Sequence, residues 1–535
     1  MSIASSRRAV DAIALVCFLL GVLALFAFTA DDAFIVLRYA TNLVAGHGLV
    51  FNRGEPVCAL TSPLHGLLMS ALAVVAAPSH LELANKCLAC VTLAATGIFA
   101  GRALFPDNEQ RALFYVLSLF SPFVLLWTVG GLETPYLSAL VLSAFVAYVK
   151  IVSPRCESVR GLLLTFHGLC GLALVCRADS AVFLLPLLVH VAIRFRRARL
   201  LYIGWVMLVV SVAAWAAFAT YYYGNPIPTS AYYKLGVKTT AFLDNLGYSS
   251  EFLLFSGLGL LVLLFAIKRF ATSQANDRHL PSGVAWVSGV LLFMYSLTQS
   301  AQHMFFGFRF FAPYVPVLMA VCVERLRLQQ RHVQWLILAL VIGQVGLVFQ
   351  MQQFGVNVTV TGAFAHTNSR EYDDVSLDQY SKFIEELKQP AVSIAKHWEL
   401  QHRSDQPRLA VYSGGVPPFL LPKFYVLESL VSYRRKCHPD FFLQGHYVQF
   451  LIIGPPDKQR LQSLLEDVER RHAGPTEVVY LGKFQFANGT FPHIVLFVPK
   501  PRPLSLPPRI GDDCPLVADG VEPGASVPAH RLADQ

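Results

Sequence analysis

The chain has 535 residues, of which 55% are hydrophobic and only 14% are charged, whereas a soluble globular protein carries roughly 25% charged residues. This composition and the mean hydropathy of +0.50 exclude an ordinary cytosolic enzyme. The net charge of +9 comes from basic residues in short loops between apolar blocks. It therefore indicates membrane topology, and we expect no nucleic-acid partner.

Twelve apolar blocks are candidates for helices that cross a lipid bilayer. The first, at about 9–28, follows Arg7 and Arg8 and lacks a small-residue cleavage pattern, so we expect an uncleaved helix with a cytoplasmic amino end. The others lie near 64–78, 83–101, 111–129, 133–149, 160–176, 180–193, 200–222, 251–267, 282–298, 312–323 and 333–350.

Basic loops between these blocks give the orientation of the chain. Clusters of Arg and Lys at 194–199, 268–278 and 325–331 are mutually consistent as cytoplasmic loops. They leave everything after about 351 on the outer side, which an even number of crossings does not allow. One short block, 64–78 or 180–193, must therefore be re-entrant or peripheral, and we expect about eleven transmembrane helices.

The composition becomes mixed polar and apolar after about residue 351. Strands are predicted at 409–412, 450–453, 478–481 and 494–498, and helices at 376–388 and 457–471. We expect a transmembrane domain at 1–350 with an outer loop at 30–63, and a soluble extracytoplasmic α/β or α+β domain at 351–500. The tail at 501–535, rich in Pro, Gly, Asp and Ala, is predicted to be disordered.

The outer loop after the first helix concentrates polar residues. Asp31 and Asp32 stand where the helix leaves the membrane, and a solvated helix end is the simplest explanation of such a pair. Further polar residues follow in the same loop, among them Arg38, Tyr39, Asn42, His47, Asn52, Arg53 and Glu55. This density indicates a site, in which a carboxylate could deprotonate a hydroxyl or bind a divalent cation such as Mg, Mn or Ca.

The same segment resembles the signature of a GT-C family of membrane glycosyltransferases. That family includes the mycobacterial terminal arabinofuranosyltransferase of cell-wall arabinan and related bacterial enzymes. The matching residues are Asp31-Asp32-Ala-Phe-Ile, Arg38-Tyr39-Ala, Asn42-Leu, Gly46-His47-Gly48-Leu-Val-Phe-Asn52, Gly54-Glu55 and Thr61-Ser62-Pro63-Leu64. Three further elements follow in order, at 131–135 (Gly-Leu-Glu-Thr-Pro), 177–179 (Arg-Ala-Asp) and 222–234.

The resemblance implies a polytopic α-helical GT-C membrane protein, embedded in the cytoplasmic membrane. Such enzymes transfer a sugar from a polyprenyl-phosphate donor to a cell-surface glycan or glycoconjugate outside that membrane. It also implies an inverting reaction with Asp31 or Asp32 as general base. Arabinofuranose is the first candidate for the sugar, and a hexose such as mannose or glucose is the second.

The leaving lipid phosphate requires cationic or hydrogen-bonding partners. The resemblance and the position of these residues give Arg177, Lys234, Arg309 and His303 as candidates for binding it. Candidates for binding the substrates are Arg38, Tyr39, Asn42, Glu55, His65, Glu133, Asp179 and Tyr223. Arg or Lys near helix ends also reach lipid headgroups, and a simple ion pair between Arg177 and Asp179 is an alternative.

Two departures from the family pattern leave the sugar and the acceptor open. The usual Glu-Gly-Tyr-Thr-Ser-Pro-Leu-Trp is Cys-Ala-Leu-Thr-Ser-Pro-Leu-His at 58–65, and the usual Gly-Gly-Asp-His-Phe carries Gln302 in place of Asp. Carboxylates and aromatic faces commonly hold sugars, so these losses bear on specificity. A polytopic transporter of lipid-linked sugars and an inactive glycan-binding relative are the alternatives from other classes.

Overall fold

The computed structural model describes residues 3–153, 159–229, 231, 241–259, 280–298, 307–325, 330–353, 376–400, 407–411, 415–427, 447–452, 477–486 and 489–498. The chain forms two compact units. Unit 1 comprises 1–30, 61–226 and 239–378, and unit 2 comprises 31–60, 227–238 and 379–535. The segment at 31–60 thus groups with residues after 378 and not with its neighbours in sequence. The domain boundary near residue 350 stays a prediction.

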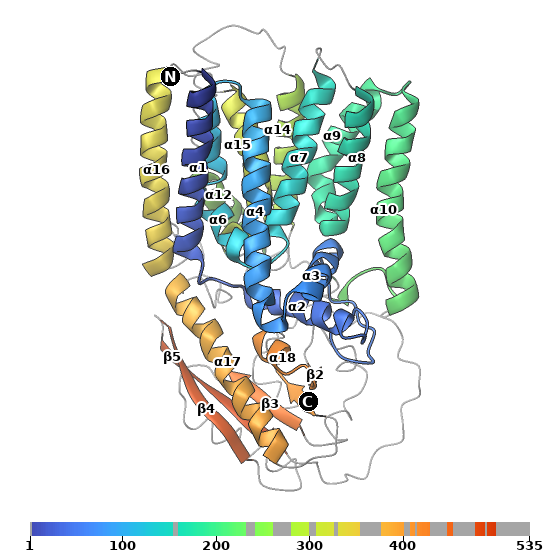
Figure 1. Cartoon of the computed structure of the whole chain (residues 1–535), viewed down its shortest axis with the longest axis vertical. Coiled ribbons are helices and arrows are strands. Elements are labelled where there is room, and N and C mark those ends of the chain that lie inside the picture. Colours follow the sequence, from blue (N-terminus) through green and yellow to red (C-terminus); the bar gives the residue numbers. More distant parts are fainter. Residues whose placement is uncertain are drawn as a thin grey trace. The chain divides into compact units, whose positions relative to one another are not determined.

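Unit 1 is a bundle of helices, most of which run side by side (Figure 1). Its helices are α1 (Ile3–Leu25), α3 (Pro63–Val75), α4 (Pro78–Leu104), α5 (Asn108–Ser118), α6 (Pro122–Val129), α7 (Thr134–Val152), α8 (Val159–Cys176), α9 (Ala181–Arg194), α10 (Arg199–Tyr223), α12 (Ala241–Phe255), α14 (Leu280–Ser296), α15 (Val315–Arg325) and α16 (Gln330–Gln353), with short 3-10 turns at Ala178–Ser180 and Ala312–Tyr314. The predicted polytopic helical membrane fold is confirmed.

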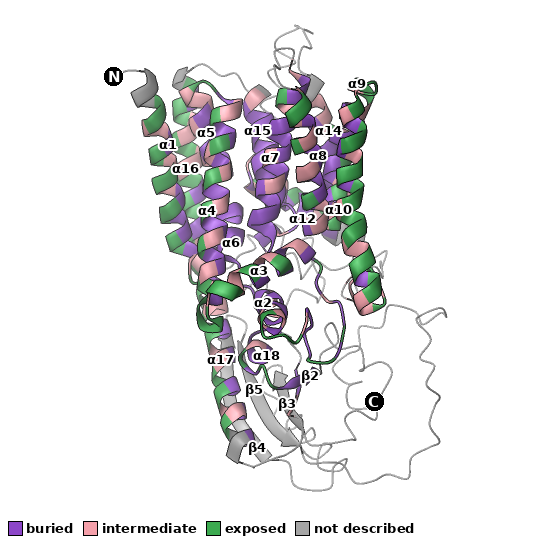
Figure 2. Ribbon diagram, turned by 45° about the vertical axis from the view of Figure 1, so that its right-hand side comes forward, coloured by how far each residue is buried: buried purple, intermediate pink, exposed green. Residues whose placement is uncertain are grey.

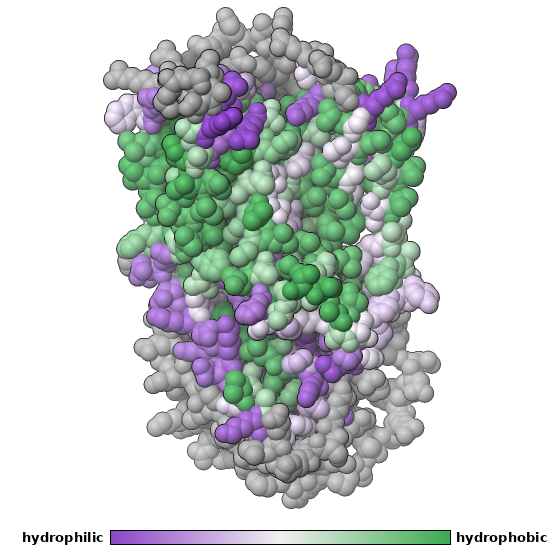
Figure 3. Space-filling view, in the orientation of Figure 1, coloured by the Kyte–Doolittle hydropathy of each residue, from purple (hydrophilic) through white to green (hydrophobic). Residues whose placement is uncertain are grey.

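Six helices among the described residues are long and apolar enough to cross a membrane, or seven if α5 and α6 form one bent span. Buried residues concentrate in α7, whereas α10 and α16 expose most of their apolar side chains (Figure 2). Figure 3 shows the resulting hydrophobic band over the long helices. Eleven crossings would require shorter helices and residues outside the described part to span as well, so that number stays a prediction.

The helix boundaries refine two of the predicted blocks. The block at 111–129 is not one straight helix, because Pro122 starts a new helix after Ser121 and the two axes differ by 56°. Helix α3 has 13 residues, about 20 Å of helix against about 30 Å of hydrocarbon. It lies at one end of the bundle in Figures 1 and 2. This favours 64–78 as the block that does not cross.

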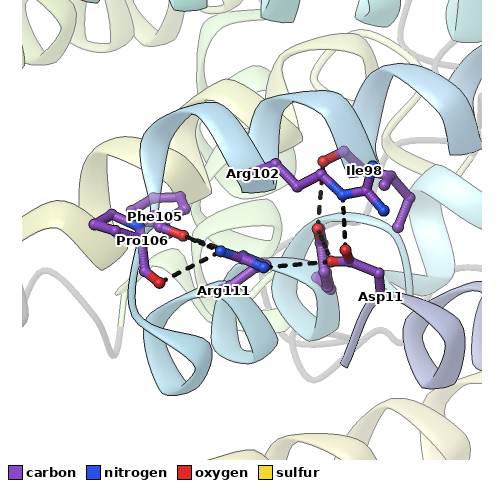
Figure 4. A network of polar contacts seen from close by, with 7 residues as sticks. Asp11, Ile98, Arg102, Phe105, Pro106 and Arg111 are labelled. Atoms are coloured by element: carbon purple, nitrogen blue, oxygen red, sulfur yellow. Dashed lines mark hydrogen bonds and ion pairs between the residues drawn. The ribbon is translucent and has the colours of Figure 1, made fainter. Parts of the chain in front are cut away.

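A polar network joins α1, α4 and α5 (Figure 4). Asp11 lies within an apolar helix and is almost fully buried, where an unpaired carboxylate would be costly. It accepts hydrogen bonds from Arg102 Nε and from the Tyr115 hydroxyl, both at 2.7 Å. Arg111 lies 3.8 Å from the same carboxylate and also donates to the carbonyl of Phe105. The network therefore fixes the turn between α4 and α5 against α1.

Unit 2 contains a mixed five-stranded sheet and three helices. The helices are α2 (Asp31–Val44), α17 (Leu377–Leu400) and α18 (Val416–Leu420), and the strands are β1 (Arg408–Ala410), β2 (Tyr425–Leu427), β3 (Tyr447–Ile452), β4 (Glu477–Phe486) and β5 (Gly489–Val498). The strand order is β2-β1-β3-β5-β4, with β1 parallel to β2 and β3 and the other pairs antiparallel. The four predicted strands and the first predicted helix are present; 457–471 and 501–535 lie outside the described residues.

The predicted outer loop at 30–63 is in part a helix, which corrects its interpretation as a polar loop. Residues 31–44 form α2, because Ala33, Phe34, Leu37 and Ala40 recur at helical spacing and are buried. The ring of Phe34 packs against Phe419 of α18, with centroids 5.5 Å apart. The burial of this face binds α2 to the C-terminal part of unit 2.

Candidate active site

Asp31 and Asp32 form the first turn of α2 in unit 2. Carboxylates are favoured there by the partial positive charge at a helix N-terminus. One carboxylate oxygen of Asp31 accepts a hydrogen bond from the backbone N–H of Val416 at 2.9 Å. The backbone N–H of Asp31 donates to the Tyr380 hydroxyl at 3.2 Å. Two segments of the C-terminal part of unit 2 therefore hold Asp31 in place.

A metal role for Asp31 and Asp32, which are neighbours in the first turn of α2, stays a prediction. Among the described residues, no group of three or more His, Cys, Asp or Glu side chains could hold a metal ion.

Gly415 allows Val416 to approach Asp31. A Cβ at Gly415 would overlap the carboxylate carbon and the backbone oxygen of Asp31. G415A is therefore expected to lower the thermal midpoint of the purified protein, because overpacking costs about 1–3 kcal/mol. The matched control is G343A, at a position on α16 where a Cβ meets no atom within 4 Å. An unchanged midpoint for G415A would show that this contact is not formed.

Arg38, a predicted substrate-binding residue, makes structural contacts within unit 2, and its role in binding stays a prediction. Its side chain is 1% exposed. The guanidinium donates to the carbonyls of Phe51, Pro418, Leu421 and Phe424, at 2.8 Å to Phe51 and 2.7 Å to Phe424. Since Arg carries five N–H donors, these bonds occupy most of its hydrogen-bonding capacity. Arg38 thus ties the 418–424 segment to α2.

Three other predicted substrate-binding residues are buried in the same packing. The Tyr39 hydroxyl donates to the carbonyl of Val57 at 2.6 Å, and the Asn42 amide donates to the carbonyls of Val50 and Phe51, each at 2.9 Å. One oxygen of Glu55 accepts hydrogen bonds from Asn52 and Tyr425. These hydrogen bonds stabilise unit 2, and the other oxygen of Glu55 is buried without a hydrogen-bond partner among the described residues. The predicted role of the three residues in substrate binding stays a prediction.

Unit 1 brings together two of the family elements, at 131–135 and 177–179, with Arg309 in one charged cluster. Glu133 precedes α7 and is 2% exposed. Arg177 donates to Glu133 at 2.6 Å and binds both carboxylate oxygens of Asp179, at 3.0 and 2.5 Å. Arg309 lies 3.6 Å from the same oxygen of Glu133. The predicted alternative of an Arg177–Asp179 ion pair is thus present, within a larger network.

The electrostatics of this cluster favour the charged forms of Glu133 and Arg177. Burial alone raises the pKa of Glu133, but the charges of Arg309 and Arg177 outweigh it and hold that pKa below its ordinary value. Burial lowers the pKa of Arg177, whereas Asp179 and Glu133 raise it to a net value well above the ordinary one. Two cations and two carboxylates cancel formally, so the cluster orients its arginines without a surplus of positive charge.

Arg309 is held by an unusual turn of the backbone. Gly307 and Phe308 both have positive φ, at 56° and 52°, and a bulky residue such as Phe rarely adopts this conformation. Phe308 is buried edge-on against Phe123, with centroids 4.8 Å apart, which offsets the strain. Trp127 donates to the carbonyl of Gly307 at 2.8 Å, and its ring lies 5.5 Å from the Arg309 guanidinium.

His65, near the start of α3, is buried close to this cluster. It is 1% exposed, and its ring lies 5.4 Å from that of Tyr136. Burial lowers the pKa of His65 to about 4, and the nearby Glu133 opposes that shift. Neither ring nitrogen has a hydrogen-bond partner of normal geometry among the described residues. His65 is therefore a buried neutral imidazole beside the charged cluster, and its role in substrate binding stays a prediction.

The buried neutral state of His65 predicts a pH dependence of stability. The unfolded chain binds a proton near pH 6.5 and the folded chain only near pH 4, so stability falls as the pH drops through this window. The slope is at most about 1.4 kcal/mol per pH unit. H65Q should flatten the fall of the thermal midpoint between pH 7.5 and 5.5. H47Q, at an exposed position, should keep the wild-type slope; equal slopes in both variants would contradict the assignment.

One further predicted substrate-binding residue lies at the end of a long helix. Tyr223 ends α10 and packs edge-on against Tyr222, with ring centroids 4.8 Å apart. Lys234 and His303 lie outside the described residues, as does Gln302. Sequence reasoning missed Asn85, Trp127 and Tyr136, which surround the cluster. A polar Asn within an apolar helix is the signal that could have identified the first.

Comparisons with known proteins agree with this architecture. No protein-family model matches the chain. Its structure resembles the crystal structure of ArnT from Cupriavidus metallidurans bound to undecaprenyl phosphate, with a TM-score of 0.59 over 91% of this chain and 97% of that chain, at 13% sequence identity. The chain has the fold of ArnT. The apo structure of ArnT gives a TM-score of 0.57 over 92% of this chain and 98% of that chain.

A sequence relative points to the same group of proteins. The chain is 32% identical over 170 residues to the terminal beta-(1->2)-arabinofuranosyltransferase of Mycobacterium tuberculosis. This match covers 29% of the chain and 23% of the relative, so the chain spans about a quarter of the length of the curated protein that it matches. The predicted resemblance to GT-C membrane glycosyltransferases is confirmed, and the chain is a multi-pass membrane protein.

Proposed function

We propose that the chain is an integral-membrane glycosyltransferase that transfers a sugar from a polyprenyl-phosphate donor to a cell-surface glycan or glycoconjugate. The observation that carries this proposal is the ion pair between Arg177 and Glu133. It joins two of the ordered family elements, and Arg309 extends it from a third segment. The ArnT fold and the arabinofuranosyltransferase match support the same activity.

The reaction is a single displacement with inversion at the anomeric carbon. Asp31 or Asp32 accepts the proton of the acceptor hydroxyl while that oxygen attacks the anomeric carbon. The bond from this carbon to the phosphate oxygen breaks, and the polyprenyl phosphate leaves with the electron pair. Arg177 and Arg309 provide N–H donors for the phosphate oxygens, whose negative charge grows during the step.

Both Asp31 and Asp32 are candidates for the base. One oxygen of Asp31 accepts a hydrogen bond from the N–H of Val416, so Asp31 also places the start of α2. Arabinofuranose is our first candidate for the sugar, on the strength of the mycobacterial relative. A hexose is the second, since His65 replaces an aromatic residue of the family pattern and offers a hydrogen bond in place of an indole face.

We place the reaction on the outer face of the cytoplasmic membrane, with the amino end in the cytoplasm and the C-terminal domain outside. The three Arg and Lys clusters at 194–199, 268–278 and 325–331 support this orientation. A cysteine-accessibility experiment tests it. A thiol introduced at Val392, which is exposed, should react with a membrane-impermeant reagent in intact cells, and protection of that thiol would reverse the orientation.

The activity is tested with the full-length protein in detergent or membranes. Synthetic polyprenyl-phosphate arabinofuranose, mannose and glucose are offered with an extract of cell-surface glycans, and the product is identified by mass spectrometry with and without EDTA. Transfer from one donor establishes the reaction and names the sugar. Loss of transfer in EDTA would show that a cation is required. Movement of a donor across liposomes without transfer would favour a transporter instead.

A further inference from the structure

Three polar residues lie on one face at the beginning of α4. Glu82, Asn85 and Lys86 are spaced i, i+3 and i+4, so they stack on the same side of the helix. Asn85 is 1% exposed and Lys86 is 4% exposed. Polar and charged groups within an apolar helix are costly unless they are paired and serve a purpose. None of the three belongs to the family elements described above.

Lys86 and Glu82 hold the chain where it leaves α1. The Lys86 ammonium donates to the carbonyl of Phe26 at 2.8 Å and lies 5.1 Å from the centre of that residue's ring. It also lies 3.4 Å from Glu82, whose carboxylate accepts a hydrogen bond from the Thr29 hydroxyl at 2.5 Å. The backbone from Phe26 to Thr29 is thereby fixed, and Asp31 follows two residues later.

Asn85 holds the turn that carries Glu133. Its amide nitrogen donates to the carbonyl of Gly131 at 2.8 Å, and its oxygen accepts a hydrogen bond from the Tyr136 hydroxyl at 2.8 Å. Gly131 has a φ of 81°, a conformation that favours glycine. The turn is therefore fixed on both sides, by its own backbone geometry and by Asn85.

The two segments are also bonded directly to each other. The backbone N–H of Ala30 donates to the carbonyl of Gly130 at 3.0 Å. Phe28 packs edge-on against Trp127, with centroids 5.8 Å apart. One face of α4 thus contacts both the segment that precedes Asp31 and the turn that precedes Glu133. None of the contacting residues of α4 belongs to a family element.

We infer that Asn85 and Lys86 are positioning residues for the transfer reaction, fixing the chain before Asp31 and the turn before Glu133, an inference that rests on the proposed function. They act through backbone carbonyls and do not contact the substrates. Misplacing a reacting group by about 1 Å costs about 100-fold in rate. Loosening either segment is therefore expected to lower kcat and to leave donor binding nearly unchanged.

Kinetics of Lys86 variants separate positioning from ligand contact. K86M is expected to lower kcat about 100-fold with the donor KM within about twofold of wild type. K86R, which keeps a donor for the Phe26 carbonyl and a charge for Glu82, should recover most of kcat. The matched control is K150M, at an exposed position in the last turn of α7, which should retain full activity. Wild-type kcat in K86M, or a raised KM with unchanged kcat, would overturn the inference.

Amide hydrogen exchange gives a second readout that does not depend on transfer. K86M should accelerate exchange in 26–31, and N85A should accelerate it in 129–134, with strand β5 unchanged in both. If K86M does not fold, the inference is tested by hydrogen exchange in N85A and by kcat in K86R. If the wild type transfers no sugar from any donor, the proposed function fails. Accelerated exchange confined to these segments then still supports the structural part, and uniform exchange in all variants overturns it.

Discussion

Replacing both aspartates, in D31N/D32N, is expected to abolish sugar transfer while the protein remains folded. Asparagine keeps an oxygen that can accept the hydrogen bond from Val416, which Asp31 receives at 2.9 Å. It cannot accept a proton from an acceptor hydroxyl, and general-base catalysis contributes about 10²–10⁴-fold to the rate. The measurement is kcat with the active polyprenyl-phosphate donor, together with the thermal midpoint of the purified variant.

The single variants separate the roles of the two carboxylates. The variant that removes the general base should lose nearly all of the activity that the double variant loses. If Asp32 is the base, D31N should retain part of kcat, because its side chain still supports the start of α2 and the approach of Gly415. Full activity in the double variant would remove both residues from the mechanism. Loss of activity in D31N alone, with normal D32N, would make Asp31 the base.

The second large effect is expected for R177M. Glu133, with its side chain 3% exposed, would keep only Arg309 at 3.6 Å, and Asp179 would lose its two hydrogen bonds. Breaking a buried ion pair by removing one partner costs about 3–5 kcal/mol. We therefore expect a lower thermal midpoint together with a large loss of transfer, because Arg177 is also a proposed partner of the phosphate. R196M, at an exposed arginine, is the matched control.

The pH dependence of R177M distinguishes this explanation from general misfolding. In the wild type the pKa of Glu133 lies below its ordinary value of 4.5, because Arg309 and Arg177 outweigh burial. Its carboxylate therefore contributes stability above that range, and this contribution is lost as the pH falls through the folded pKa. Without Arg177 the pKa of Glu133 rises, so protonation relieves the buried charge at a higher pH.

The difference in thermal midpoint between wild type and R177M should accordingly narrow as the pH is lowered from 7 to 5. Adding E133Q to R177M should recover part of the lost stability at pH 7, since the uncompensated carboxylate is gone. A constant difference across this pH range, with no recovery in the double variant, would show that the pair does not stabilise unit 1. K150M again provides a charge-removing control.

Much of the fold follows from local properties of the sequence. Apolar blocks of spanning length predict helices, because the hydrocarbon core leaves no partner for an unpaired backbone N–H or carbonyl. Short continuous apolar runs such as Phe450–Ile453, which ends at a Gly-Pro-Pro turn signal, predict buried strands. The break at Pro122 could also have been anticipated, since proline begins a helix but interrupts one.

The sequence predicts the individual residues of the charged cluster, but it does not predict that they contact one another. Glu133, Arg177 and Arg309 were each candidates from their motifs, and nothing in their spacing of 44 and 132 residues requires them to meet. The structure joins them because α7, the turn after α8 and the strained turn at Gly307 converge in unit 1. Their ion pairs then fix the geometry of the side chains.

The sequence by itself determined the helical membrane class, the C-terminal α/β elements and the family elements, because each depends on local hydrophobicity or on residue identity. Only the tertiary structure decided that Arg38, Tyr39 and Asn42 stabilise unit 2 and that Asn85 and Lys86 support the segments of the site. Those roles depend on which carbonyls lie within about 3 Å of each side chain. That distance is set by the packing of residues remote in sequence, and no local pattern encodes it.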